Sequence, residues 1–227
     1  MATKLAGDYF SDFQNVFALE PGKTALIPVD LQYGSACRST GLGKLLNDGG
    51  KNGLGSYRFD RIENVVVPNV QKLLAFFRKH QLRVIYLTLG SLMPDYSDIP
   101  AHRRAFMKAK NVRRGEKEYE ILDEVKPWPG EMVINKTTPS AFNSSEIDST
   151  LRAMDIRYCL FAGVSTHMCV EGTARDASDR GYNSVLVEDA CGANKPEFHD
   201  NALLVFQRGY GRVSTTDEVI RELERKL

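Results

Sequence analysis

The chain has 227 residues, enough for one α/β domain with a full hydrophobic core. Hydrophobic residues make up 42% and charged residues 26%, and no apolar run approaches the length of a membrane span. The formal net charge of +1 gives no reason to expect nucleic acid or a membrane surface as a partner.

The beginning of the chain has acidic residues and no apolar core, so we expect no secretory signal. The four cysteines show no CxxC spacing, and they are expected to be reduced thiols of a cytoplasmic protein. They are Cys37, Cys159, Cys169 and Cys191.

Residues 1–22 are predicted to form an N-terminal arm, and residues 23–227 a single domain. Aromatic residues in the arm recur at roughly helical spacing, at Tyr9, Phe10, Phe13 and Phe17. Such a helix either packs on the core of its own domain or grips a neighbouring subunit, and periodicity does not separate these alternatives.

Strands and helices alternate along the rest of the chain. Strands are predicted at 24–30, 83–89, 131–136, 157–164, 184–188 and 211–214. Helices are predicted at 61–80, 116–125, 146–154, 173–180, 198–207 and 217–226, and long loops at 34–55 and 90–115. This alternation predicts an α/β fold, a three-layer sandwich built on a six-stranded parallel sheet.

Three chemically reactive residues follow or end predicted strands. Asp30 ends the first strand and Lys136 the third, while Cys169 follows the fourth in the first turn of a helix. The carboxyl ends of parallel strands share one edge of a sheet, so the three side chains are expected to converge in one crevice. There Asp30 would take the thiol proton, and Lys136 would keep Asp30 ionised and favour the thiolate.

Each of the three also has an ordinary structural interpretation. Asp30 could cap a turn, Lys136 could be a surface charge, and Cys169 could be a buried structural cysteine. At the start of a helix, the dipole and the free N–H groups are expected to lower the pKa of the Cys169 thiol.

Three motifs in order carry a family resemblance: ALIPVDLQ around Asp30, INKTTPSAF around Lys136, and AGVSTHMCVEGTARDASDRGY around Cys169, followed by VLVEDACGA. Over about residues 23–215 the chain resembles the isochorismatase-like cysteine hydrolases. These include nicotinamidases and N-carbamoylsarcosine, ureidoacrylate and biuret–triuret hydrolases. The resemblance implies an Asp30–Lys136–Cys169 catalytic triad, a cis peptide bond between Val164 and Ser165, and an oxyanion hole formed by the N–H groups of Ser165 and Cys169.

Departures from the family bear on the substrate. Nicotinamidases carry an Asp-x-His metal motif after the second strand, where this chain has LTLGSLMPDYSD without histidine. The chain is therefore expected to need no metal ion or other cofactor. The retained Cys and Lys favour a C–N bond of a small linear amide or ureide over the vinyl ether of isochorismate.

Substrate-binding residues are less well defined by the sequence. Gln32, Tyr33 and Phe142 stand beside the triad in the chain and are predicted to line the site. Phe142 could equally be an ordinary core aromatic, and Gln32 a turn residue. Arg38, Arg58 or Arg103 could bind a substrate carboxylate, or each could be a surface charge. The basic run from His102 to Arg114 is likewise either a solvated face or an anion-binding element.

The leading hypothesis is a metal-independent cysteine amidohydrolase that works through a thioester on Cys169. A non-catalytic member that binds a ligand or partner in the same crevice is the alternative, together with a vinyl ether hydrolase of the isochorismate type. A thiol-redox protein is disfavoured, since Cys169 has no resolving cysteine nearby in the sequence. The resemblance also implies a homodimer or homotetramer.

Overall fold

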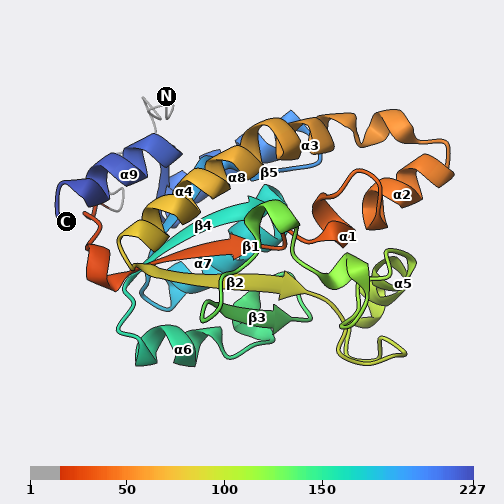
Figure 1. The fold of residues 1–227 in the computed structure, drawn as a ribbon, viewed down its shortest axis with the longest axis horizontal. Coiled ribbons are helices and arrows are strands. Elements are labelled where there is room, and N and C mark those ends of the chain that lie inside the picture. The colour runs from red at the N-terminus through yellow and green to blue at the C-terminus, as the bar shows by residue number, and fades with distance from the viewer. Residues whose placement is uncertain (1–15) are drawn as a thin grey trace.

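The computed structural model describes residues 16–227. In this part of the chain, six parallel strands form one sheet in the order β3-β2-β1-β4-β5-β6 (Figure 1). The strands are β1 (Thr24–Val29), β2 (Arg83–Leu89), β3 (Met132–Lys136), β4 (Tyr158–Val164), β5 (Asn183–Gly192) and β6 (Arg212–Ser214). The predicted three-layer sandwich on a six-stranded parallel sheet is confirmed.

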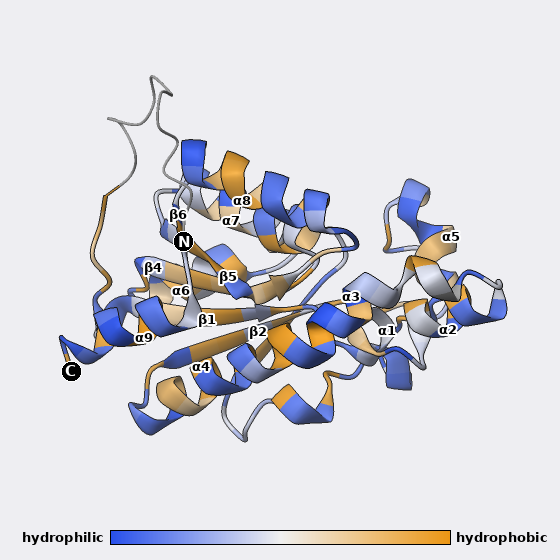
Figure 2. Cartoon of the chain, turned by 90° about the horizontal axis from the view of Figure 1, so that it is seen from above, coloured by the Kyte–Doolittle hydropathy of each residue, from blue (hydrophilic) through white to orange (hydrophobic). Residues whose placement is uncertain are grey.

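Helices cover both faces of the sheet, as Figures 1 and 2 show. One face carries α3 (Ser56–Arg61), the π-helical turn η4 (Ile62–Val66), α4 (Val67–Lys79) and α9 (Thr216–Glu224). The opposite face carries α6 (Ile147–Ala153), α7 (Glu171–Asp179) and α8 (Pro196–Gly209). Every residue of β1 and β4 is buried, because both strands are central and covered on both sides.

The two long predicted loops contain helices, so that part of the prediction was wrong. Residues 34–55 include most of α1 (Tyr33–Ala36), α2 (Gly41–Asp48) and the 3-10 turn η3 (Asn52–Leu54), while residues 90–115 include α5 (Ala101–Ala109). The helix α2 packs Leu42 and Leu46 against the core, and α5 buries Met107. The short apolar face of each helix is difficult to recognise in the sequence, because α2 contains glycines and α5 contains several positive charges.

The helix predicted at 116–125 is also replaced, by two separate 3-10 turns. These are η5 (Lys117–Tyr119) and η6 (Asp123–Val125). Further short turns are η2 (Pro21–Lys23), η7 (Ala141–Asn143) and η8 (Thr166–Val170), of which η8 is π-helical.

The end of the predicted N-terminal arm lies against the C-terminal helix. Leu19 is fully buried, its N–H donates to Glu222 at 2.8 Å, and its carbonyl accepts from Lys226 at 2.7 Å. Residues 16–20 have no regular secondary structure. Tyr9, Phe10 and Phe13 lie outside the described residues, so the arm at 1–22 and the boundary at residue 23 stay predictions.

The sheet order places a topological switch between β1 and β4, since β1 connects toward β2 on one side and β4 toward β5 on the other. Ligand sites of open α/β sheets lie at the carboxyl ends of strands at such a switch. Figures 1 and 2 show α1, α2 and α5 gathered at this end of the molecule. Over residues 16–227, no helix has the length and apolar character that a membrane span requires.

Candidate active site

A buried ion pair lies at the carboxyl ends of the strands. Lys136, the last residue of β3, donates from Nζ to Asp30 Oδ2 at 2.8 Å, and the two side chains are 0% and 3% exposed. Asp30 follows β1 with a left-handed φ of 52°, a conformation that aspartate tolerates better than most residues. Its other oxygen, Oδ1, is buried without a hydrogen-bond partner. The carboxylate therefore keeps one free acceptor inside the site.

The segment after β4 brings Cys169 to the same place. Gly163 has a φ of 115°, and a Cβ there would lie 2.1 Å from Val29 O, so only glycine allows β4 to approach β1 this closely. The peptide bond between Val164 and Ser165 is cis. The π-helical turn η8 then carries Cys169, which is buried.

The setting of the Cys169 thiol differs from the one expected from the sequence. Burial raises the pKa of this thiol to about 11; the nearby Lys136 ammonium opposes the rise, and the Asp30 carboxylate adds to it. The predicted lowering of its pKa was therefore wrong, because desolvation outweighs the position at the start of a helix. In the free protein at neutral pH the sulfur holds its proton beside a carboxylate.

A chain of hydrogen bonds runs from Arg61 through His199 to the side chain of Thr166, which directly follows Ser165. The Arg61 guanidinium donates to His199 Nε2 at 2.9 Å, and because arginine only donates, Nε2 accepts. His199 Nδ1 therefore carries the proton that is donated to Thr166 Oγ1, also at 2.9 Å. Burial lowers the pKa of His199 to about 4, so the ring is neutral near pH 7. These hydrogen bonds connect Arg61 and His199 to the Thr166 side chain at the start of η8.

A cavity opens next to Cys169, and several of its lining residues were not singled out from the sequence. Its polar lining includes Ser35, Arg58, Arg103, Lys110 and Asn194 together with Asp30. Leu42, Leu89, Phe106 and Met168 supply apolar surface.

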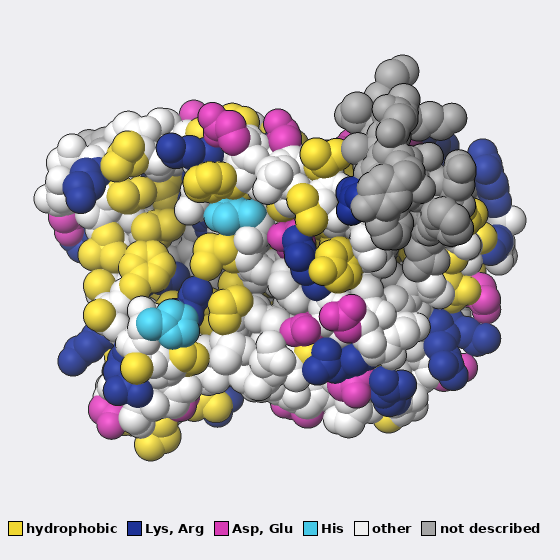
Figure 3. All heavy atoms as spheres, turned by 180° about the vertical axis from the view of Figure 1, so that it is seen from behind, with side chains coloured by type: hydrophobic (Ala, Val, Ile, Leu, Met, Phe, Trp, Pro, Cys, Tyr) yellow, Lys and Arg dark blue, Asp and Glu magenta, His cyan; other side chains and the backbone are white. Residues whose placement is uncertain are grey.

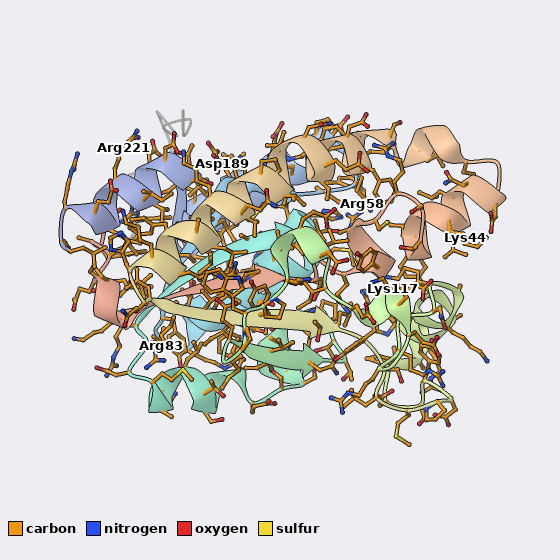
Figure 4. The ribbon with its side chains drawn as sticks, in the orientation of Figure 1. Lys44, Arg58, Arg83, Lys117, Asp189 and Arg221 are labelled. Atoms are coloured by element: carbon orange, nitrogen blue, oxygen red, sulfur yellow. The ribbon has the colours of Figure 1, made fainter. Side chains whose placement is uncertain are left out.

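Arg58 is the buried centre of this lining. Figure 4 shows Arg58 on the side of α3 near the ends of the central strands. Its guanidinium donates to Ser35 O at 2.7 Å, Ser165 Oγ at 2.7 Å and Asn194 Oδ1 at 2.9 Å. Burial lowers the pKa of Arg58 to about 10, while Cys169 and Asp30 oppose this shift. Arg58 thus joins α1, the residue before η8 and the segment after β5 around the cavity.

The three residues predicted to line the site do not border this cavity. The Gln32 side chain is buried and accepts from Leu89 N at 2.8 Å while donating to Tyr119 O at 2.7 Å. Tyr33 donates to Asp123 at 2.9 Å. Phe142 packs on Tyr182 with ring centroids 5.9 Å apart. Gln32 and Tyr33 closely follow Asp30 in the chain and Phe142 follows Lys136, but each of their side chains is engaged elsewhere.

Of the three arginines that could bind a substrate carboxylate, one lies at the surface and two line the cavity. Arg38 is half-exposed and pairs with Asp60 at 2.6 Å and Glu63 at 2.8 Å, so it is a surface charge. Arg58 and Arg103 both line the cavity. Lys110, from the basic run, joins them there, so this part of the run is not merely a solvated face.

The other cysteines and the possible metal ligands are dispersed. All four cysteines are free, and burial raises the pKa of Cys159 and Cys191. The described residues contain no group of three or more His, Cys, Asp or Glu side chains arranged to hold a metal ion.

The isochorismatase domain model matches residues 24–218, which is most of the chain. The chain therefore belongs to the isochorismatase family, in agreement with the resemblance seen in its motifs.

Several curated relatives of the chain are named as ureidoacrylate amidohydrolases. The chain is 31% identical over 216 residues to the ureidoacrylate amidohydrolase RutB of Pseudomonas syringae pv. syringae, covering 88% of this chain and 83% of that protein. The corresponding protein of Caulobacter segnis is 41% identical over 111 residues, covering 48% of this chain and 46% of that protein. The chain thus spans about half the length of the Caulobacter relatives that it matches.

Solved structures support the same fold. A cysteine hydrolase from Pseudomonas syringae pv. phaseolicola superposes with a TM-score of 0.77 at 25% identity, covering 94% of this chain and 98% of that chain. The N-carbamoylsarcosine amidase of Thermoplasma acidophilum gives a TM-score of 0.64 at 27% identity, with 86% and 97% covered.

Proposed function

We propose that this chain is a cysteine hydrolase that cleaves a C–N bond of a small amide or ureide through a thioester on Cys169, without a metal ion. The buried Asp30–Lys136 ion pair beside the Cys169 thiol carries this proposal. The names of the relatives, ureidoacrylate amidohydrolase and N-carbamoylsarcosine amidase, support the same bond type.

The first half of the reaction forms the thioester. Asp30 accepts the thiol proton as the sulfur attacks the carbonyl carbon, so that no free thiolate has to accumulate in the buried site. The N–H groups of Ser165 and Cys169 then hold the oxyanion of the tetrahedral intermediate. When that intermediate collapses, the C–N bond breaks and Asp30 returns the proton to the leaving amine or ammonia.

The second half reverses these roles with water. Asp30 takes a proton from the water that attacks the thioester, the C–S bond breaks, and the proton returns to the sulfur. Lys136 stays bound to Asp30 Oδ2 throughout and orients the carboxylate. The free Oδ1 is the atom that carries the proton.

Substitutions of the reacting groups test this proposal. We expect Cys169→Ala to lower ammonia release from a panel of short N-carbamoyl compounds and primary amides at least about a thousandfold, and Asp30→Asn about a hundredfold or more. Unchanged turnover after dialysis against EDTA is expected. Circular dichroism controls for folding.

Two results would reject the proposal. One is full turnover by folded Cys169→Ala protein. The other is a wild-type protein that binds members of the panel but hydrolyses none, which would favour a non-catalytic binding protein.

We also propose that the chain acts in the cytoplasm as a homodimer or homotetramer. Figure 3 shows hydrophobic side chains gathered on the face opposite that of Figure 1, at the end that carries α5. Phe106, Met168 and Phe198 are among the exposed hydrophobic residues of α5, η8 and α8. Light scattering on the purified protein tests this assembly, and a monomer at micromolar concentration would contradict it.

A further inference from the structure

Two arginines of α3 hold two consecutive residues of the turn that follows β4. Arg58 donates to Ser165 Oγ at 2.7 Å. Arg61 donates to His199 Nε2 at 2.9 Å, and His199 donates from Nδ1 to Thr166 Oγ1, also at 2.9 Å. Residues three apart lie on the same side of a helix, so one turn of α3 reaches both residues that follow β4.

The chain of hydrogen bonds from Arg61 to Thr166 is anchored on β5 and ends in the protein interior. The Arg61 guanidinium also donates to two carbonyl oxygens of β5, Cys191 O at 2.9 Å and Glu188 O at 3.0 Å. Thr166 is fully buried, and His199 is 5% exposed. Water is therefore kept from competing for the bond between His199 and Thr166.

This chain of hydrogen bonds joins the two faces of the sheet. Arg61 belongs to α3 on one face, and His199 belongs to α8 on the other. Thr166 is the first residue of η8, the turn that carries Cys169. The chain thus ties the start of η8 to helices of both layers.

The side chains of Arg61, His199 and Thr166 lie outside the cavity lining that the described residues form. Ser165, which directly precedes Thr166, does line the cavity. The proposed reaction needs the Ser165 N–H to point at the oxyanion, and such a donor is effective only when it is held in place before the charge develops. A group that fixes Thr166 can therefore affect the reaction without touching the substrate.

We propose that His199 and Arg61 are positioning residues: through the Thr166 side chain, they hold the Ser165 N–H in the direction that the oxyanion requires. The inference rests on the proposed function, because the oxyanion arises in that reaction. Arg58 holds Ser165 from the same helix but also lines the cavity, so its substitution would change two properties at once. Substitutions of Thr166 and His199 are free of this ambiguity.

Substitution of Thr166 by valine tests the role of the chain in catalysis. Valine keeps the shape of threonine and removes the hydroxyl group that His199 contacts. On the best substrate of the N-carbamoyl and amide panel, Thr166→Val and His199→Leu should each lower kcat about ten- to a hundredfold. The same oxyanion hole serves thioester formation and thioester hydrolysis, so both steps slow together and KM should stay within about threefold of wild type.

Conservative variants and a matched control separate positioning from general stability. Thr166→Ser keeps the hydroxyl group, and His199→Asn keeps an N–H near the place of Nδ1, so both should retain most of kcat. Thr216→Val is the control, because Thr216 is also fully buried and donates its hydroxyl to Asp189 at 2.8 Å. Thr216 does not line the cavity, so this variant should keep kcat within about twofold of wild type.

Hydrogen exchange followed by mass spectrometry measures the restraint on the turn without requiring turnover. In Thr166→Val, the amides of the peptide that contains Ser165 and Thr166 should exchange about tenfold faster than in wild type, because a buried hydrogen bond is lost. Thr216→Val should leave the exchange of this peptide unchanged.

The outcomes separate this inference from the proposed function. If wild-type protein hydrolyses the panel but Thr166→Val loses no more kcat than Thr216→Val, the positioning role is wrong and the hydrolase proposal stands. Unchanged exchange in Thr166→Val, or a Thr166→Ser variant as slow as Thr166→Val, also overturns the positioning role. If wild-type protein hydrolyses no member of the panel, the hydrolase proposal fails and the positioning role fails with it.

Discussion

At the scale of single residues, the chemistry depends on charges held away from water. Lys136 is fully buried, and its recorded hydrogen bonds go to Asp30 and, at 3.4 Å, to Thr138 O. A buried ion pair is costly to break, because removing one partner leaves the other charge uncompensated.

We therefore expect Lys136→Met to destabilise the fold by about 3–5 kcal/mol, measured by urea denaturation. The double variant Asp30→Asn with Lys136→Met should recover most of this loss, since asparagine also tolerates the left-handed backbone at position 30. A single Lys136→Met variant as stable as wild type would contradict the buried pair.

The same scale shows why some site residues were beyond prediction. Gln32, Tyr33 and Phe142 adjoin Asp30 or follow Lys136 closely in the chain, yet neighbouring side chains leave the backbone in different directions. Conversely, Lys110 is distant in sequence from Asp30 and Cys169, and it lines the same cavity because α5 lies at the ends of the strands. Nearness in the sequence therefore does not predict which residues line a cavity that forms between distant segments of the chain.

At the scale of elements, the strands were predictable because their burial is nearly continuous. β1 and β4 are almost entirely apolar, as is typical of strands in a parallel sheet that is covered on both faces. The helices α2 and α5 were missed because each buries only part of one face. Their packing depends on the finished sheet rather than on their own pattern.

The turn after β4 offers a test at this scale. Gly163→Ala should destabilise the protein by about 2–4 kcal/mol, because its φ is left-handed and the new Cβ would meet Val29 O. Gly172→Ala in α7 is the matched control: its Cβ meets nothing within 4 Å, and helix propensity predicts a gain of about 0.5–1 kcal/mol. Equal effects of the two substitutions on thermal unfolding would contradict this account of the turn.

At the scale of the whole molecule, the burial of a lysine in the cavity affects the stability of the fold. Burial lowers the pKa of Lys110 to about 8 from its ordinary 10.5; Arg58 and Arg103 lower it further, while Asp30 and Cys169 oppose them. The charged form of Lys110 is therefore disfavoured in the folded chain. A buried cation without a carboxylate partner therefore lowers the stability of the folded chain.

Lys110→Met should accordingly stabilise the free protein near pH 7, by on the order of 1–3 kcal/mol. The unfolded chain binds the Lys110 proton more tightly than the folded chain does. The destabilisation caused by charged Lys110 therefore has its full size below pH 8 and decreases as the pH rises from 8 to 10.5. The stability difference between variant and wild type should shrink over that interval in denaturation curves. A difference that stays constant from pH 7 to 10.5 would contradict an uncompensated Lys110.

The formation of a covalent intermediate on Cys169 is the central claim, and mass spectrometry of rapidly acid-quenched reactions with the N-carbamoyl panel tests it most directly. The account predicts an acyl mass increase on the peptide that contains Cys169, absent from the Cys169→Ala variant. Steady turnover with the adduct on another residue, or turnover retained by Cys169→Ala, would contradict it.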